Sequence, residues 1–338
     1  MRIYVEAAGC TNACRHCGAG GHPPPDSHYS AAELRRIARA WGEPVWPYYE
    51  ATVHSEFPEI VAPEIVGKEN TAVLATNGYG LAHRDDFPDV FGRLRAFGFG
   101  GCSFTLHGLE AHHDWWAGRD GAFQDILTAS RRAVQCGFGL WWNLYLDREN
   151  LEDIPALVDI CAGELGGSGA LGIPFHRVGA RMWRYEQHRP SLRDVSERLA
   201  LGVLPDAWRG PLGCALDRLT EAHWISIWEE APDSDGFRHP LEPTTWPPQP
   251  PFEHVQLYLT RDRHVDLDPL CAERIRLGRL SDGKEAALER LTALHPPAFS
   301  DTRPDEARRR LGESDLLHCH GFSVRLKAIS SARRMSPA

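Results

Sequence analysis

Three cysteines near the amino end are the residues whose type and spacing point most directly to chemistry. The segment reads Cys10-Thr-Asn-Ala-Cys14-Arg-His-Cys17, so the thiols are separated by three and then by two residues. Thiolates are the usual ligands of iron-sulfur clusters, and a short loop with thiols this close can hold three corners of a four-iron cubane. No fourth cysteine lies nearby, which leaves one iron open for a substrate or cofactor.

Two other uses of these thiols stay open as alternatives. One is a zinc site completed by His16 or His22, which would make the chain a zinc-stabilised binding module without redox chemistry. Structural zinc sites usually show paired Cys-x-x-Cys knuckles with four ligands, which this segment lacks. The other is a ferredoxin-like electron carrier, which would not need an α/β body of 338 residues. The open-site cluster is therefore favoured.

The composition is typical of a cytoplasmic globular protein. The chain is 42% hydrophobic, but no apolar run approaches the roughly 18 to 20 residues of a membrane span, and the first ten residues lack a signal-peptide layout. The net charge of -9 comes from 46 acidic and 37 basic residues without a basic stripe. We therefore expect neither a nucleic-acid nor a membrane partner. Nine cysteines in a reducing compartment favour metal ligation over disulfides.

Short apolar segments alternate with amphipathic ones along the first half of the chain. The expected strands are residues 1–8, 45–50, 72–75, 101–106 and 140–146. The expected helices are residues 31–41 after a Ser30–Glu33 capping box, 87–97, 122–136, and 151–161 with Asn150 as N-cap. This alternation predicts a parallel sheet with crossover helices, either open or closed into a barrel.

The pattern changes in the second half. Regular alternation ends near Arg189, and residues 232–252 are rich in proline and serve as the candidate linker. After it we expect a hairpin of residues 255–260 and 264–268 and a helix over 284–294. The expected parts are residues 1–188 for the core, 189–252 for the connection and 253–338 for a smaller C-terminal α+β domain.

The cysteine spacing, placed directly after the first strand, resembles the Cys-x-x-x-Cys-x-x-Cys signature of the radical S-adenosylmethionine (SAM) superfamily. Other landmarks of that family follow in order over residues 1–185. They are Tyr48-Tyr49-Glu50-Ala51 in the place of Gly-Gly-Glu-Pro, Thr76-Asn77-Gly78, Ser103 to Gly108 with His113, Asp114 and Gly118, and Pro174 to Arg181. The resemblance implies an α/β fold, a partial (β/α)6 TIM-like barrel with its site at the carboxyl ends of the strands.

The resemblance also implies roles for individual residues. Cys10, Cys14 and Cys17 would hold a [4Fe-4S] cluster, and Glu50 would hold the amino group of SAM. The candidate cofactor-binding residues are His16, Glu50, Asn77, Ser103, Thr105, Asn143, Gly179 and Arg181. The candidate substrate-binding residues are Tyr48, Tyr49, His107 and Arg177. Many relatives carry an arginine before the glycine at 118, where this chain has Trp115-Trp116-Ala117, so the partner of the SAM carboxylate is unassigned.

The segment from Asp266 to Cys271 resembles a degenerate SPASM or twitch extension. Cys214, Cys271 and Cys319 would then hold an auxiliary iron-sulfur cluster, or they are isolated buried thiols. The implied activity is reductive cleavage of SAM to a 5'-deoxyadenosyl radical that takes hydrogen from a small metabolite, nucleoside or sugar. Oxidation, epimerisation or sulfur insertion would follow, with flavodoxin or ferredoxin as reductant. A peptide-modifying enzyme is the alternative within the superfamily.

Overall fold

The computed structural model describes residues 1–14, 25–144, 149–150, 152–164, 169–174, 256–267, 275–293 and 323–327. The expected linker over residues 232–252 lies outside these ranges. The expected boundaries between the three parts of the chain therefore stay predictions.

The described strands form two five-stranded sheets, ordered β2-β1-β7-β8-β9 and β10-β6-β5-β4-β3. The strands of the first sheet are β1 (Arg2–Val5), β2 (Val45–Pro47), β7 (Gln256–Leu259), β8 (His264–Leu267) and β9 (Ile275–Arg279). Those of the second are β3 (Val73–Ala75), β4 (Gly101–Leu106), β5 (Gly139–Leu144), β6 (Gly169–Pro174) and β10 (Ser323–Lys327). Pairing is parallel from β3 through β6 and between β1 and β2, which confirms the predicted α/β class. Between the described strands β2 and β3 no ladder forms, so the barrel is open there.

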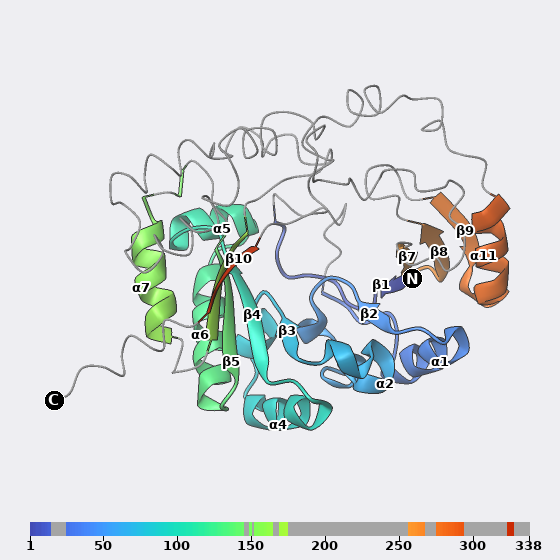
Figure 1. Cartoon of the computed structure of the whole chain (residues 1–338), viewed down its shortest axis with the longest axis horizontal. Coiled ribbons are helices and arrows are strands. Elements are labelled where there is room, and N and C mark those ends of the chain that lie inside the picture. Colours follow the sequence, from blue (N-terminus) through green and yellow to red (C-terminus); the bar gives the residue numbers. More distant parts are fainter. Residues whose placement is uncertain are drawn as a thin grey trace.

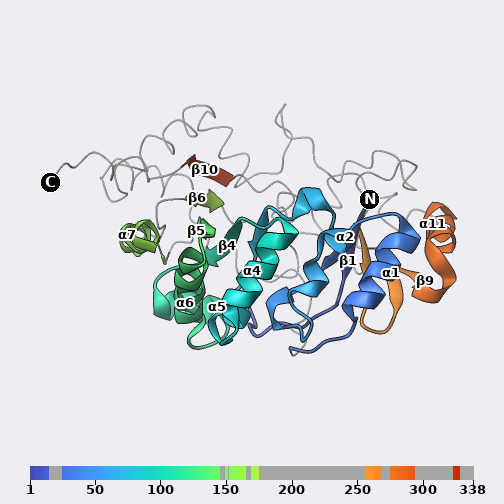
Figure 2. The same ribbon diagram turned by 90° about the horizontal axis from the view of Figure 1, so that it is seen from below.

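Helices follow the strands and cover one side of both sheets (Figures 1 and 2). They are α1 (Ala31–Trp41), α2 (Pro63–Val66), α3 (Tyr79–Ala82), α4 (Phe87–Phe97), α5 (Glu110–Ala117), α6 (Ala122–Gln135), α7 (Ile154–Glu164) and α11 (Gly283–Ala293). Short 3-10 helices are η1 (Ala51–Val53), η2 (Glu59–Val61), η3 (Lys68–Asn70) and η5 (Leu280–Asp282). The predicted Ser30–Glu33 capping box begins α1, and left-handed Gly42 ends it.

Most predicted elements are confirmed to within a few residues, but Asn150 is not the N-cap of α7. That helix begins at Ile154, and the buried Asn150 side chain instead donates to the carbonyl oxygen of His107 at 2.7 Å. A buried carbonyl at a strand exit needs a donor, and this need outweighs the local capping preference. The helix α5 and the parallel pairing of β7 with β1 were not predicted.

Side chains alternate across the strands between a buried face and an inner face. In β1, Ile3 and Val5 are fully buried and pack toward the helices, whereas Tyr4 points to the other side. In β4, Phe104 is buried and Thr105 is partly exposed. One hydrophobic core joins residues of both sheets, each large apolar side chain contributing about 1.5–3 kcal/mol by burial. The inner face is thereby left to polar and aromatic groups.

The C-terminal hairpin is bound to the segment that precedes α1. The β7 and β8 strands pair antiparallel as predicted, and the Tyr29 hydroxyl donates to the carbonyl oxygen of Thr260 at 2.6 Å. The Arg263 guanidinium lies 3.6 Å from the centre of the Tyr29 ring and donates to the His28 carbonyl and to Glu33. Burial raises the pKa of Tyr29 to about 12, so this phenol stays a hydrogen-bond donor. The hairpin therefore belongs to the same packed unit as β1.

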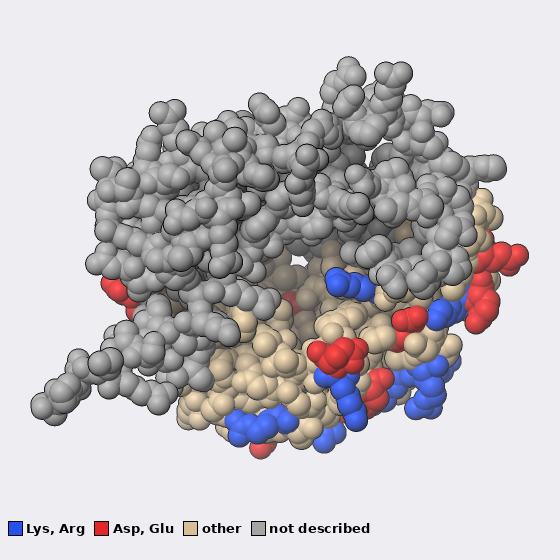
Figure 3. Space-filling view, viewed as in Figure 1, with Lys and Arg blue, Asp and Glu red and all other residues tan. Residues whose placement is uncertain are grey.

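Acidic and basic side chains are interspersed on the described part of the face in Figure 3. Arg35 pairs with Glu59 at 2.8 Å and with Glu64 at 2.6 Å, and Arg93 also reaches Glu59 at 2.7 Å. Because the opposite charges in these pairs lie side by side, they do not create a surface potential of a single sign. In the described part of the chain, none of the helices is long and apolar enough to cross a membrane.

Two helical glycines give a matched test of how closely η1 and α3 pack. A Cβ at Gly80 of α3 would overlap the carbonyl oxygen and hydroxyl of Thr52, whereas one at Gly92 of α4 would meet no atom within 4 Å. We expect Gly80→Ala to lower the free energy of unfolding by about 1–3 kcal/mol because backbone must move. Gly92→Ala should raise it by about 0.5–1 kcal/mol. Urea denaturation of both variants measures this, and equal effects would contradict the close approach.

Candidate functional site

Most predicted site residues within the described ranges lie just beyond the carboxyl ends of neighbouring strands or near those ends. Cys10 follows β1, Glu50 follows β2, Asn77 follows β3, and Ser103 and Asn143 lie within β4 and β5. Parallel strands bring these positions to one rim. The Cys10 thiol, the Glu50 carboxylate and the side-chain amides of Asn77 and Asn143 lie on the inner side of that rim.

Two of the three predicted cluster ligands, Cys10 and Cys14, lie within the described residues. Both side chains are partly exposed. The Cys10 sulfur faces two N–H donors, the Asn12 backbone at 3.4 Å and the Asn77 amide at 3.6 Å. Hydrogen bonds to sulfur suit a thiolate ligand and tune a cluster's potential. The donor set present therefore fits the predicted cluster, although Cys17 lies outside the described residues.

Two other described cysteines, Cys102 and Cys161, are buried. Cys102 on β4 is fully buried among apolar side chains, and burial raises its pKa to about 12. Burial likewise raises the pKa of Cys161 on α7. Thiols held in the protonated form inside the core are inert packing residues. Cys136, at the end of α6, is partly exposed like Cys10 and Cys14, so their spacing and not their exposure sets these two thiols apart.

Glu50 joins the end of β2 to the end of β3. Its Oε1 accepts from the backbone and hydroxyl of Thr52 at 3.1 and 2.6 Å and from the Thr76 hydroxyl at 2.8 Å. Its Oε2 accepts from the Asn77 backbone at 2.5 Å. Burial raises the pKa of Glu50, and these donors offset part of the rise. Among the described partners, Oε2 has fewer donors than Oε1 and keeps the larger spare acceptor capacity.

Tyr48 and Tyr49 replace two glycines of the resembling motif, and the backbone keeps a glycine-like shape there. Tyr49 has φ +68, a left-handed conformation uncommon for a residue with a side chain. The Tyr48 ring packs edge-on against Tyr258 at 4.9 Å between centroids and against Tyr4 at 5.7 Å. Beyond this turn, the Glu50 amide donates to the Gly9 carbonyl at 3.1 Å. The turn therefore still reaches the cysteine loop.

The predicted residues of β4 and β5 form a polar patch on the inner face. The Asn143 amide donates to the Ser103 hydroxyl at 3.0 Å, and Thr105 lies opposite Asn143 in the ladder. The Ser103 carbonyl accepts from the Thr76 amide at 3.1 Å, which joins this patch to the turn after β3. Their roles toward SAM stay predictions.

His107 is buried and packed. It is 3% exposed, its backbone N–H donates to Nδ1 of His113 at 3.2 Å, and its ring centre lies 6.1 Å from that of Trp116. His113 is itself 2% exposed, and its Nε2 has no hydrogen-bond partner within the described ranges. Burial lowers the pKa of His113 to about 3, so the ring is neutral. These histidines shape the exit of β4.

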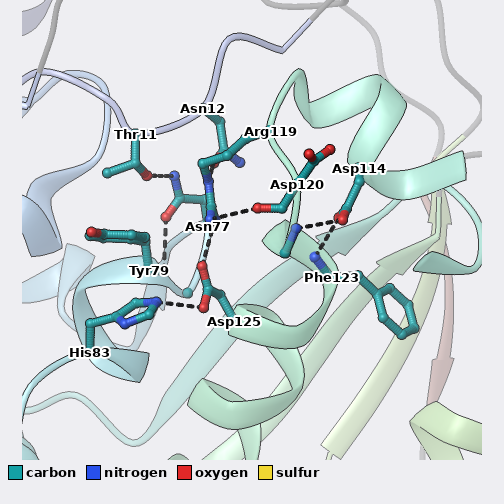
Figure 4. Close-up of polar contacts among 12 residues, drawn as sticks. Thr11, Asn12, Asn77, Tyr79, His83, Asp114, Arg119, Asp120, Phe123 and Asp125 are labelled. Carbon is teal, nitrogen blue, oxygen red and sulfur yellow. Dashed lines mark hydrogen bonds and ion pairs between the residues drawn. The ribbon is translucent and has the colours of Figure 1, made fainter. Parts of the chain in front are cut away.

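Sequence reasoning missed a second group of polar residues beside the cysteine loop (Figure 4). Arg119 donates from Nε to the Asn12 side chain at 2.8 Å and pairs with Asp125 at 2.7 Å. Asp125 also accepts from His83 at 2.7 Å. An available signal was the Gly118-Arg119 pair, which stands just after the position where the resembling motif carries its arginine.

Several predicted site residues lie outside the described ranges, and their roles stay predictions. They are His16, Cys17, Arg177, Gly179, Arg181, Cys214, Cys271 and Cys319.

Comparisons with known proteins support the fold. No protein-family profile matches the sequence, and no curated protein matches it. The solved structure of SuiB from Streptococcus suis bound to S-adenosylmethionine is similar over 93% of this chain and 71% of SuiB, with 11% identity and a TM-score of 0.52.

Two further structures are similar at lower scores. Native anSMEcpe with bound AdoMet and a peptide covers 95% of this chain and 88% of its own, with 13% identity and a TM-score of 0.49. HemN from Escherichia coli, a coproporphyrinogen III oxidase described as a radical SAM enzyme, covers 60% and 52%, with 16% identity and a TM-score of 0.39. Of these similarities, only the one to SuiB, with its TM-score of 0.52, supports the fold. The similarity to SuiB confirms the predicted α/β fold.

The hydrogen bonds of Glu50 predict a cost for changing its charge without changing its shape. In Glu50→Gln an amide NH2 must face one of the donors from Thr52, Thr76 or Asn77. We expect the free energy of unfolding to fall by about 1–3 kcal/mol, the cost of a buried group left unsatisfied. Glu59→Gln, in a half-exposed ion pair, should cost about 0–1 kcal/mol. Chemical denaturation of both proteins measures the difference, and the reverse order would refute this role for Glu50.

The buried neutral ring of His113 predicts acid sensitivity. Its pKa falls from 6.5 to about 3 on folding, so the unfolded chain binds the extra proton between these values. The stability contributed by the neutral ring is present above about pH 6.5 and is lost as the pH falls. From pH 7 to pH 5 we expect the wild type to lose up to about 2 kcal/mol through this group. His113→Gln should lack that part of the loss in urea titrations at both pH values.

Proposed function

We propose that this chain is a radical SAM enzyme whose cluster is held by Cys10, Cys14 and Cys17. The observation that carries the proposal is the junction at the strand ends, where the Cys10 sulfur, the Asn77 amide and the Glu50 carboxylate meet through direct hydrogen bonds. The cysteine spacing gives three ligands, and the fold shared with a SAM-bound structure supports the same cofactor. A bound cluster would supply the electron that cleaves SAM to a 5'-deoxyadenosyl radical.

The residues of the chain would bind and orient the cofactor. Glu50 is the acceptor for the SAM amino group through Oε2, because a cation beside a buried carboxylate offsets its cost of burial. Asn77 donates to Cys10 and, through its backbone, to Glu50, so it sets the distance between cluster and amino group. Ser103, Thr105 and Asn143 offer hydroxyl and amide groups to the SAM carboxylate or ribose.

The substrate would bind at the inner face of the sheets. Tyr4, Tyr48 and Tyr258 form a packed aromatic wall there. Such a wall suits a small metabolite, nucleoside or sugar, which is the substrate class we propose. A peptide substrate is the alternative. The proposal also includes flavodoxin or ferredoxin as the reductant and a cytoplasmic location. It further includes an auxiliary cluster bound by Cys214, Cys271 and Cys319.

Cleavage of SAM tests the function directly. Anaerobically reconstituted protein should convert SAM to 5'-deoxyadenosine with dithionite, and Cys14→Ala should abolish this because one cluster ligand is lost. Cys136→Ala, at the end of α6, is the matched control and should keep the activity. The product is measured by chromatography. A Cys14→Ala protein that still makes 5'-deoxyadenosine would show that the motif is misinterpreted.

Metal analysis separates the remaining alternatives. About four irons and four sulfides per chain would indicate one cluster, and about eight of each would indicate an auxiliary cluster as well. One zinc per chain in a colourless protein would instead support the binding module and end the enzyme hypothesis.

A further inference from the structure

Three consecutive residues between Cys10 and Cys14 each form a hydrogen bond with a residue outside the cysteine loop. Thr11 accepts from the Asn77 amide at 3.1 Å, Asn12 accepts from Arg119 Nε at 2.8 Å, and the Ala13 amide donates to the Ala117 carbonyl at 2.9 Å. Two of these partners come from the last residue of α5 and from the turn that follows it. The conformation of the loop that carries Cys10 and Cys14 is therefore fixed by contacts with other parts of the chain.

The turn approaches the loop as closely as backbone allows. Gly118 has φ +64, and a Cβ there would lie 2.5 Å from the Ala13 carbonyl oxygen. Only glycine combines this conformation with this approach at no steric cost. Arg119 directly follows, so its side chain begins beside Asn12, which is 4% exposed.

The Arg119 guanidinium is oriented by contacts that do not involve the cysteine loop. Its Nη2 lies 2.7 Å from Asp125 Oδ2, and its Cζ lies 5.1 Å from the centre of the Tyr79 ring. Asp125 is 8% exposed, sits in the first turn of α6 and is held on its other oxygen by His83 at 2.7 Å. Figure 4 shows Arg119 between Asn12 on one side and Asp125 on the other. A guanidinium keeps its charge, so it can form an ion pair with Asp125 while its Nε donates a hydrogen bond to Asn12.

We infer that Arg119 is a positioning residue that holds Asn12, and with it the spacing of Cys10 and Cys14, in the geometry that binds the cluster. This inference rests on the proposed function. The chain of contacts runs from Asp125 through Arg119 to Asn12, whose backbone N–H donates to the Cys10 sulfur. Residues that orient metal ligands in this way typically alter metal retention 10–100-fold when replaced.

A purely structural role for the Arg119–Asp125 pair is the competing explanation. In that case its loss would weaken the α5–α6 turn and lower global stability, without a specific effect at the loop. The two explanations differ at Asn12, because Asn12→Ala removes the loop end of the bridge and leaves the ion pair intact. Arg131→Gln is the matched control, since Arg131 pairs with Glu164 at 2.8 Å on the exposed side of α6 and α7.

Hydrogen exchange on the apo-protein tests the loop without any cluster. The Ala13 amide, which donates to Ala117, should exchange about 10-fold faster in Arg119→Gln and in Asn12→Ala than in the wild type. The double variant should add little to either single change, because both remove the same bridge. Arg119→Lys should fall between, since an ammonium does not span both partners. Arg131→Gln should match the wild type.

Retention of iron tests the consequence. After anaerobic reconstitution, loss of iron to a chelator should be about 10-fold faster in Arg119→Gln and Asn12→Ala than in Arg131→Gln. Unchanged exchange at Ala13 together with unchanged iron loss would overturn the inference. A raised KM for SAM with neither of those effects would also overturn it, by showing that Arg119 contacts SAM instead.

The outcomes separate this inference from the proposed function. If the wild type binds iron but makes no 5'-deoxyadenosine, the proposed function fails while the exchange data still decide the role of Arg119 in the loop. If Arg119→Gln does not fold, Asn12→Ala alone decides, because it leaves Arg119 paired with Asp125. An Asn12→Ala protein with wild-type exchange and iron retention would refute the bridge.

Discussion

The buried carboxylate of Glu50 holds together the point at which the two sheets meet. No ladder pairs the described strands β2 and β3, so backbone hydrogen bonds do not cross this seam. Glu50 replaces them with bonds to Thr52 on its own side and to Thr76 and Asn77 on the other. A carboxylate taken out of water must be matched by such donors, which fixes the relative position of the two strand ends.

The position of the cysteine loop follows from that seam. Asn77, set by its bond to Glu50, donates to Thr11 and to the Cys10 sulfur. From the opposite side, the turn between α5 and α6 contacts Asn12 and Ala13. The loop after β1 is thus held between two elements that come 60 to 110 residues later in the chain. The cluster-binding role that we propose for this loop would need preorganisation of this kind, because a loose ligand loop loses metal.

The C-terminal hairpin extends this arrangement on the far side of β1. Because β7 pairs with β1 in parallel, residues from the last quarter of the chain complete the sheet from which the cysteine loop emerges. Tyr29 and Arg263 then bind the hairpin to the segment that leads into α1. The aromatic wall of Tyr4, Tyr48 and Tyr258 is a product of the same pairing, since Tyr4 lies in β1, Tyr258 lies in β7 and Tyr48 directly follows β2.

The sequence by itself determined the local elements and the spacing of the three cysteines. The period of apolar residues, the Ser30–Glu33 capping box and the Cys10-Cys14 spacing are properties of neighbouring residues, and local physics is enough to interpret them. Tertiary structure decided the rest. In the folded chain Asn150 bonds to the His107 carbonyl and does not cap the helix as predicted. β7 pairs with β1, and Arg119 contacts Asn12. These contacts join residues distant in the chain, and burial decides among their possible partners, which no local pattern records.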